Sequence, residues 1–228
     1  MKELVADRLW TREMPLTLPF GLEASTRMSV VRLSGEGGGL WLHSPVALDR
    51  RLRETLDELG RVRFVVCPNR GHHMFVGGYF AAYPDASFHA APGLSEKRPD
   101  LQFHGVLGDE PEPGWGQDLE QALFRGERLL WEVVFYHQES RTLIVTDLVQ
   151  SAHSGNPPLT RLVMHLMGIH ERPGVPLHIR LGFRDKAAAR ASLERVLSWD
   201  FDRIVLAHGL VVESGGKAVL REVYSFLS

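Results

Sequence analysis

Three short, continuous runs of apolar residues constrain the fold of this chain more than any other feature of its sequence. They are RVRFVVCP (residues 61–68), TLIVTDL (142–148) and RIVLAHG (203–209). Runs of this length and composition are typical of strands that are buried on both faces. Helical patterns precede two of these runs, at 44–60 and 185–200. The alternation predicts an α/β fold in which helices cross over between the strands of a sheet.

The remaining segments fit the same fold class. Two strand-like runs flank the glycine-rich GEGGG and predict a β-hairpin over 27–46, because glycine permits the positive φ of a tight turn. The segment 129–149 predicts two strands around a turn at 138–141. We expect an irregular start that contains Pro15 and Pro19. The other expected elements are a short helix at 74–84, a strand at 86–94, a loop with short strands at 97–118, a helix at 155–169 and a terminal helix at 215–227.

Length and composition limit the classes of function. The chain has 228 residues, of which 44% are hydrophobic, and we expect one domain over 1–228. Its formal net charge of −2 gives no basic excess, so we expect neither a nucleic-acid nor a membrane-surface partner. Cys67 is the one cysteine, which excludes an internal disulfide. Without a signal-peptide pattern or a membrane-length apolar run, we expect a cytoplasmic protein.

Candidate metal ligands follow the apolar strands. RVRFVVCP leads to His72 and His73, TLIVTDL contains Asp147, and RIVLAHG contains His208. A further candidate, His137, ends the strand-like WEVVFYH. Sites in open α/β sheets gather outside the carboxyl ends of the strands, and imidazole and carboxylate are ligands of Zn²⁺, Fe and Mn sites. These residues therefore predict a metal-binding pocket at one edge of the sheet.

Each candidate also has an ordinary explanation. A single histidine is more often a surface residue or a hydrogen-bonded core residue than a ligand. An aspartate after an apolar strand, such as Asp147, is commonly a turn former or a helix cap. Cys67 is expected in the core, and the glycine-rich stretches are expected in turns. The metal-site prediction therefore depends on the order and spacing of the candidates taken together.

In that order and spacing the chain resembles the metallo-β-lactamase superfamily. The stretch PNRGHHMFVGG (68–78) lies where that superfamily has a strand followed by His-x-His-x-Asp-His. FYHQESRTLIVTDL (135–148) resembles its segment of a histidine, a strand and an aspartate, and RIVLAHG resembles its final histidine turn. The hairpin VVRLSGEGGGLWLHSP (30–45) is similar to its opening strands. The resemblance covers about 28–212 and implies a four-layer αββα sandwich.

The first signature departs from that pattern, with Asn-Arg-x-His-His in place of His-x-His-x-Asp-His. Aligning His73 with the last histidine of the signature puts His72 at its aspartate, Arg70 at its second histidine and Pro68 at its first. Two ligands of the first metal position are then missing, and only His137 remains there. The resemblance thus implies one divalent ion, zinc first and iron or manganese as alternatives. Its expected ligands are His72, His73, Asp147 and His208.

The implied activity is hydrolysis of a small ester, thioester, lactone or phosphoester by a metal-bound hydroxide. Asp147 or His137 would orient the water or act as general base. Arg70 would occupy the vacated first position and place its charge near a substrate oxyanion, unless it forms an ordinary salt bridge. Four protein ligands could also close the shell and make the site structural. An iron-dependent oxidoreductase and a catalytically inactive binding or scaffold relative remain open as alternatives.

Overall fold

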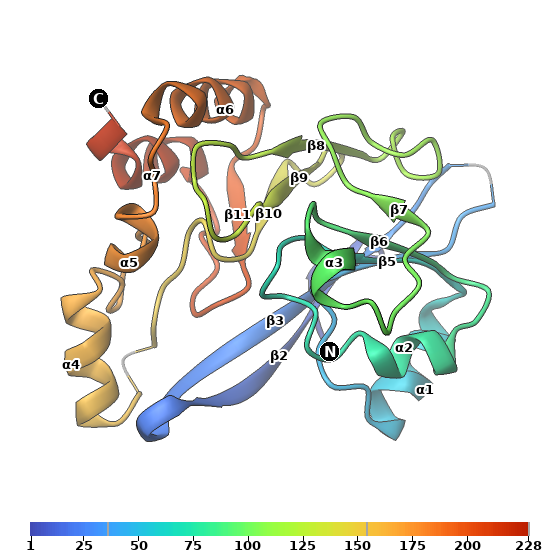
Figure 1. The fold of residues 1–228 in the computed structure, drawn as a ribbon. Coiled ribbons are helices and arrows are strands. Elements are labelled where there is room, and N and C mark those ends of the chain that lie inside the picture. The colour runs from blue at the N-terminus through green and yellow to red at the C-terminus, as the bar shows by residue number, and fades with distance from the viewer. Residues whose placement is uncertain (36, 154, 228) are drawn as a thin grey trace.

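Two β-sheets form the centre of the protein (Figure 1). The computed structural model describes residues 1–35, 37–153 and 155–227. The first sheet has the strand order β1 (Lys2–Val5), β2 (Leu9–Leu18), β3 (Leu22–Arg32), β4 (Leu40–His43), β5 (Val62–Cys67), β6 (Ser87–Ala90) and β7 (Gly105–Val106). The second has the order β11 (Arg203–Leu206), β10 (Thr142–Val145), β9 (Val133–His137) and β8 (Leu119–Leu123).

Helices cover the outer face of each sheet. Buried residues of α1 (Arg50–Leu59), α2 (Gly77–Ala82) and α3 (Leu94–Lys97) pack in one core with the first sheet. Residues of α6 (Lys186–Ser198) and α7 (Gly216–Val223) pack in another core with the second sheet. A third core lies between the sheets and contains Trp41, Phe135 and Ile144. The predicted four-layer αββα sandwich is confirmed.

The remaining helical segments lie beside these layers. They are η1 (Pro19–Gly21), α4 (Pro158–Leu166), α5 (Leu177–Arg180) and η2 (Ser225–Leu227). In Figure 1, α4 lies on the same side of the molecule as the tip of the long β2–β3 hairpin. The two segments are also in direct contact, because the backbone N–H of Glu23 donates to Thr160 Oγ1 at 3.1 Å. This side of the molecule forms one wall of the pocket described below.

The expectation of an irregular start is wrong. Strand β2 pairs with β3 over ten residues, from Leu9 opposite Val31 to Leu18 opposite Leu22. Pro15 fits in this strand because β1 pairs with only the first few residues of β2, so the other edge of β2 is free at that position. Pro15 therefore marks a free edge and does not end the strand, whereas Pro19 follows the last residue of β2 and begins η1.

Other predicted elements are found with shifted ends. The glycine-rich turn joins antiparallel strands β3 and β4 as expected, although Glu36 lies outside the described residues. Helix α1 begins only at Arg50, because Asp49 caps it by accepting the N–H of Leu52 at 2.7 Å. Helix α4 lies inside the predicted 155–169, and Ser154 just before it is not described. Strand β8 and helices α3 and α5 were not predicted.

A membrane-crossing helix is absent from the described chain, since none of its helices is both long and apolar enough.

A buried histidine of β6 makes stability depend on pH. Burial, with a smaller effect of His104, lowers the pKa of His89 to about 4. The unfolded chain binds a proton at this residue below about pH 6.5 and the folded chain does not, so the free energy of unfolding should fall between pH 6.5 and 4, by up to ~1.4 kcal/mol per pH unit. Urea titrations at pH 7 and 5 measure this loss. We expect a smaller loss for His89→Gln and an unchanged loss for His165→Gln, an exposed histidine.

The same loss in the His89→Gln variant and in the wild type would contradict this assignment. The comparison isolates His89 because every other titrating group is common to the two proteins.

Candidate metal centre

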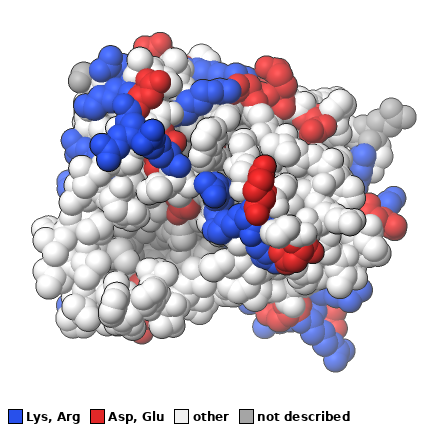
Figure 2. All heavy atoms as spheres, viewed as in Figure 1, with Lys and Arg blue, Asp and Glu red and all other residues white. Residues whose placement is uncertain are grey.

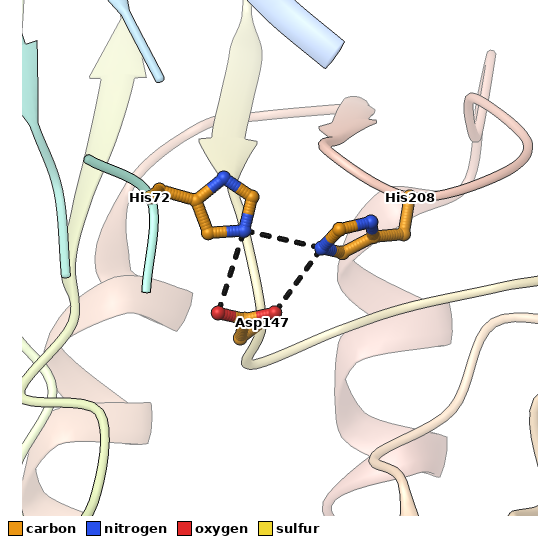
Figure 3. A group of neighbouring side chains, drawn as sticks. All are labelled: His72, Asp147 and His208. Carbon is orange, nitrogen blue, oxygen red and sulfur yellow. Dashed lines mark hydrogen bonds and ion pairs between the residues drawn. The ribbon is translucent and has the colours of Figure 1, made fainter. Parts of the chain in front are cut away.

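Three loops meet at one edge of the two sheets, and each of them follows the carboxyl end of a strand. Strand β5 leads to the turn that holds His72, β10 leads to Asp147, and β11 leads to His208. Strands β10 and β11 are parallel, so Asp147 and His208 follow their strands at the same edge. Figure 3 shows the two imidazole rings and the carboxylate directed at one another. The sequence-predicted convergence at strand ends therefore holds for these three residues.

The three side chains place their ligand atoms in a small triangle. His72 Nε2 is 3.1 Å from His208 Nε2 and 3.4 Å from Asp147 Oδ2, while His208 Nε2 is 3.2 Å from Asp147 Oδ1 (Figure 3). Bonds of ~2.0–2.1 Å to a tetrahedral ion separate ligand atoms by about 3.3 Å. The spacing and the donor set of two imidazoles and one carboxylate thus fit a divalent ion. Within the described residues, they are the cluster of candidate ligands that the structure brings together.

The far nitrogens of both rings are held by the protein. His208 Nδ1 is 2.6 Å from the carbonyl oxygen of Ser25. Because a carbonyl only accepts, Nδ1 carries the proton, and the Nε2 of the neutral ring keeps its lone pair for an ion. His72 Nδ1 is 2.6 Å from Ser44 Oγ. Contacts of this kind fix the rotation of a metal-binding imidazole.

Asn69 connects the histidine turn to the aspartate. Its Oδ1 accepts the backbone N–H groups of Gly71 at 2.7 Å and His72 at 2.8 Å. Its Nδ2 donates to Asp147 Oδ2 at 2.7 Å. One fully buried side chain therefore shapes the turn that presents His72 and also orients the carboxylate.

Glu132 supports the aspartate from beneath. This buried carboxylate accepts the backbone N–H of Thr146 at 2.7 Å, of Asp147 at 2.8 Å and of Leu148 at 3.1 Å. Burial and the negative charge of Asp147 raise the pKa of Glu132 to about 7, against these hydrogen bonds. The backbone of the segment that carries Asp147 is thus held by hydrogen bonds to the carboxylate of Glu132, which does not line the pocket.

The charges within the cluster favour an ionised carboxylate. Burial alone would raise the pKa of Asp147, but His72 and His208 hold it well below its usual range. Burial would lower the pKa of His208, whereas its hydrogen bond to Asp147 raises it. A carboxylate that stays ionised is suited to bind a cation or to orient water, and it is a weak general base.

A buried arginine holds the turn at His208. The guanidinium of Arg27 donates to the carbonyl oxygens of Leu206 and Gly209 and forms an ion pair with Glu13 at 2.9 Å. Gly209 has φ of +77°, and a Cβ there would come within 2.2 Å of the carbonyl oxygen of Ser151. Glycine is therefore required at this position, and the turn that presents His208 is fixed from two sides.

Two predicted ligands lie elsewhere. His137 lies at the opposite edge of the sheet from Asp147. Strand β9 is antiparallel to β10, so His137, at the end of β9, pairs with Thr142 at the start of β10. His137 Nδ1 contacts Ser140 Oγ at 2.7 Å. His73, which the alignment favoured, is not in the cluster, and its Nδ1 lies 3.2 Å from Arg98 Nη1. The structure thus brings together His72, Asp147 and His208 and leaves His73 out of the expected set.

Arg70 is also placed differently from the expectation. Its side chain lies against Gly93, where an added Cβ would be 3.5 Å from its Nε. Arg70 does not line the pocket beside the cluster, and its buried Nε has no hydrogen-bond partner among the described residues. The positive charge expected near a substrate is therefore not supplied from this position.

The sequence pointed to only some of the supporting residues. Asn69 lies in the Asn-Arg-x-His-His stretch, but the sequence gave it no role. Glu132 is a charged residue directly before an apolar strand, a signal that could have identified it as a buried group with partners. Arg27 and Ser25 lie about 180 residues from His208, and no sequence pattern links them.

Most of the chain matches one protein family. The model of DUF4336, described as a domain of unknown function, matches residues 6–178. The chain belongs to this family. None of the curated proteins matches it.

This DUF4336 chain has the metallo-β-lactamase fold. It is similar to DIM-1 metallo-β-lactamase exposed to ceftazidime, with a TM-score of 0.66 and 14% identity over 99% of this chain and 96% of that one. A metallo-β-lactamase from Pontibacter korlensis gives 0.64 and 14% over 99% and 97%. The mono-zinc form of FIM-1 from Pseudomonas aeruginosa gives 0.65 and 11% over 98% and 92%. At these identities the similarity concerns the fold.

Proposed function

We propose that this protein is a hydrolase that uses one divalent metal ion, bound by His72, Asp147 and His208. The observation that carries the proposal is the close approach of the ligand atoms: the two Nε2 atoms lie 3.1 Å apart, and each lies 3.2–3.4 Å from one of the two carboxylate oxygens of Asp147. The far nitrogen of each ring is in a hydrogen-bond contact. Three protein ligands leave a coordination position open, which is the arrangement of catalytic zinc sites, whereas structural sites have four. A bound ion of this kind supplies Lewis acidity and activates water near neutral pH.

The protein groups have separate tasks in such a reaction. The oxygen of water forms a bond to the acyl carbon, the bond from that carbon to the leaving oxygen breaks, and the proton of the water ends on the leaving oxygen. Asp147 orients the water by accepting a hydrogen bond. Its low pKa keeps the carboxylate ionised and makes it a weak general base. Asn69 and Gln150 each donate to one oxygen of Asp147 and hold it in place.

Zinc is the first metal in this proposal and iron is the second candidate. The mono-zinc form of FIM-1, which shares the fold, supports zinc. Two histidines and one carboxylate with open positions are also the ligand set of mononuclear iron oxygenases, which keeps an iron-dependent oxidoreductase as the alternative.

Metal analysis and metal removal test the proposal. We expect the purified protein to hold about one equivalent of zinc, to lose ester or lactone hydrolysis when a chelator removes it, and to regain turnover with added Zn²⁺. One equivalent of iron and an optical absorption band would favour the oxidoreductase. If no ion is retained and Zn²⁺, Mn²⁺ and Fe²⁺ all fail to give turnover, the proposal is wrong and a binding or scaffold role takes its place.

A further inference from the structure

A pocket of about 400 Å³ opens directly beside the candidate metal centre. The cluster of His72, Asp147 and His208 forms one side of it. Its apolar wall comes from the β2–β3 hairpin, the loop after β5, helix α4 and the segment after α4. The large apolar side chains of this wall are Leu16, Leu18, Met74, Phe75, Met164 and Ile169. Ligand sites commonly have this size and combine an apolar wall with a few polar groups at one end.

The wall of the pocket away from the candidate metal centre does not favour a negative charge on the chain of a substrate. Among the described residues, no lysine or arginine lines it, and its acidic members are Glu23 and Asp147. Of the nearby arginines, Arg27 pairs with Glu13 and Arg98 with Asp100, while Arg70 lies against Gly93 and does not line the pocket. A carboxylate held against the apolar wall, away from the candidate metal centre, would therefore lose water without gaining a lysine or arginine partner, which is unfavourable.

The mouth of the pocket is apolar as well. Leu18 is 37% exposed and Met74 is 59% exposed, and both line the pocket. In Figure 2 the face over α4 and the hairpin tip is largely free of charged side chains and is hollowed there. An apolar chain can therefore enter along this apolar side of the mouth.

We propose that this pocket binds the apolar alkyl or acyl part of an uncharged ester or lactone and places its carbonyl group at His72, Asp147 and His208. This inference rests on the proposed hydrolase function and narrows it, because it favours substrates whose chain is apolar and uncharged. Each added CH₂ group that the pocket buries should contribute ~0.8 kcal/mol, or about a fourfold increase in kcat/KM.

A series of neutral γ-lactones with alkyl chains of two, four, six and eight carbons tests the proposal on the zinc-loaded protein. We expect kcat/KM to rise about fourfold per CH₂ until the pocket is full. A carboxylate at the end of the same chain should cancel the gain. Equal rates along the series, or a preference for the charged compounds, would overturn the inference while leaving the hydrolase function intact.

A binding measurement separates the two proposals. Lactams with the same chains resist hydrolysis, and calorimetry can follow their binding to metal-depleted protein that circular dichroism shows to be folded. Tighter binding with chain length, without turnover of any lactone, would support the pocket and reject the hydrolase. Binding that does not depend on chain length would reject the pocket by itself.

A pair of variants on α4 adds a matched control. Met164 lines the pocket, whereas Leu162 is 57% exposed and does not line it. Met164→Glu should weaken binding of the longest lactam at least tenfold and leave that of the shortest nearly unchanged, whereas Leu162→Glu should change neither. If Met164→Glu does not fold, the chain-length series on the wild-type protein still tests whether the pocket binds the apolar chain.

Discussion

Replacement of His72 by alanine is expected to abolish metal binding, whereas the same change at the adjacent His73 is expected to preserve it. His72 Nε2 lies within 3.4 Å of ligand atoms of both His208 and Asp147, while His73 is turned toward Arg98. The loss in metal affinity and in kcat/KM should exceed the ~10–100-fold typical of a residue that only supports a ligand. Elemental analysis of the two purified variants, together with lactone hydrolysis, measures both effects.

His72→Ala and His73→Ala are matched controls for each other, because both changes remove an imidazole from the same turn. Circular dichroism and thermal unfolding should show that each variant is folded. If His73→Ala also loses the ion, the ligand set drawn from the structure is wrong and the four-ligand set implied by the alignment of the signature is right.

Replacement of Glu132 by alanine is expected to have the largest effect on stability. Its carboxylate accepts three backbone N–H groups, those of Thr146, Asp147 and Leu148, and all three would be left without this acceptor. Each buried donor without a partner costs ~1–3 kcal/mol, so the free energy of unfolding should fall by at least about 3 kcal/mol. For a chain of this length each kcal/mol lowers Tm by ~2–4 °C, and calorimetry should therefore show a decrease of roughly 6–12 °C.

Glu132→Gln and a surface control refine this experiment. Glutamine keeps the shape but turns an N–H toward the backbone donors, so it should also destabilise the fold and weaken metal affinity ~10–100-fold. Glu194→Gln, at an exposed position of α6, should change stability by less than ~0.5 kcal/mol. A Tm of Glu132→Ala close to that of the wild type would show that these hydrogen bonds are replaced, and it would refute their proposed role.

The sequence pattern of apolar, polar and glycine residues predicted most of the helices and strands, because these elements depend on local residue type. The apolar runs at β5, β10 and β11, the glycine turn between β3 and β4, and the amphipathic α6 all appear in the structure. Strand β2 was missed because prolines usually end strands, and only the pairing with β3 shows that Pro15 lies on a free edge.

The residues of the candidate site were likewise predicted only where the signal is local to the sequence. Residues that directly follow an apolar strand were found, because a strand end at a sheet edge is visible in the sequence. His137 was misplaced because the sequence does not show whether a strand is parallel or antiparallel to its neighbour, and that choice moves its end to the other edge. His73 was expected as a ligand together with His72, but neighbouring residues of a turn point in different directions, and only the turn geometry specifies which one reaches the cluster.

The sequence by itself determined that buried strands alternate with helices and that imidazoles and a carboxylate follow three of them. It also determined the low net charge and the absence of a disulfide. The tertiary structure alone decided which side chains share a site, because contacts such as those of His208 with Ser25 and of Glu132 with Asp147 join residues far apart in the chain. It likewise decided the apolar character of the pocket, because that wall is assembled from a hairpin, a loop and a helix that meet only after folding.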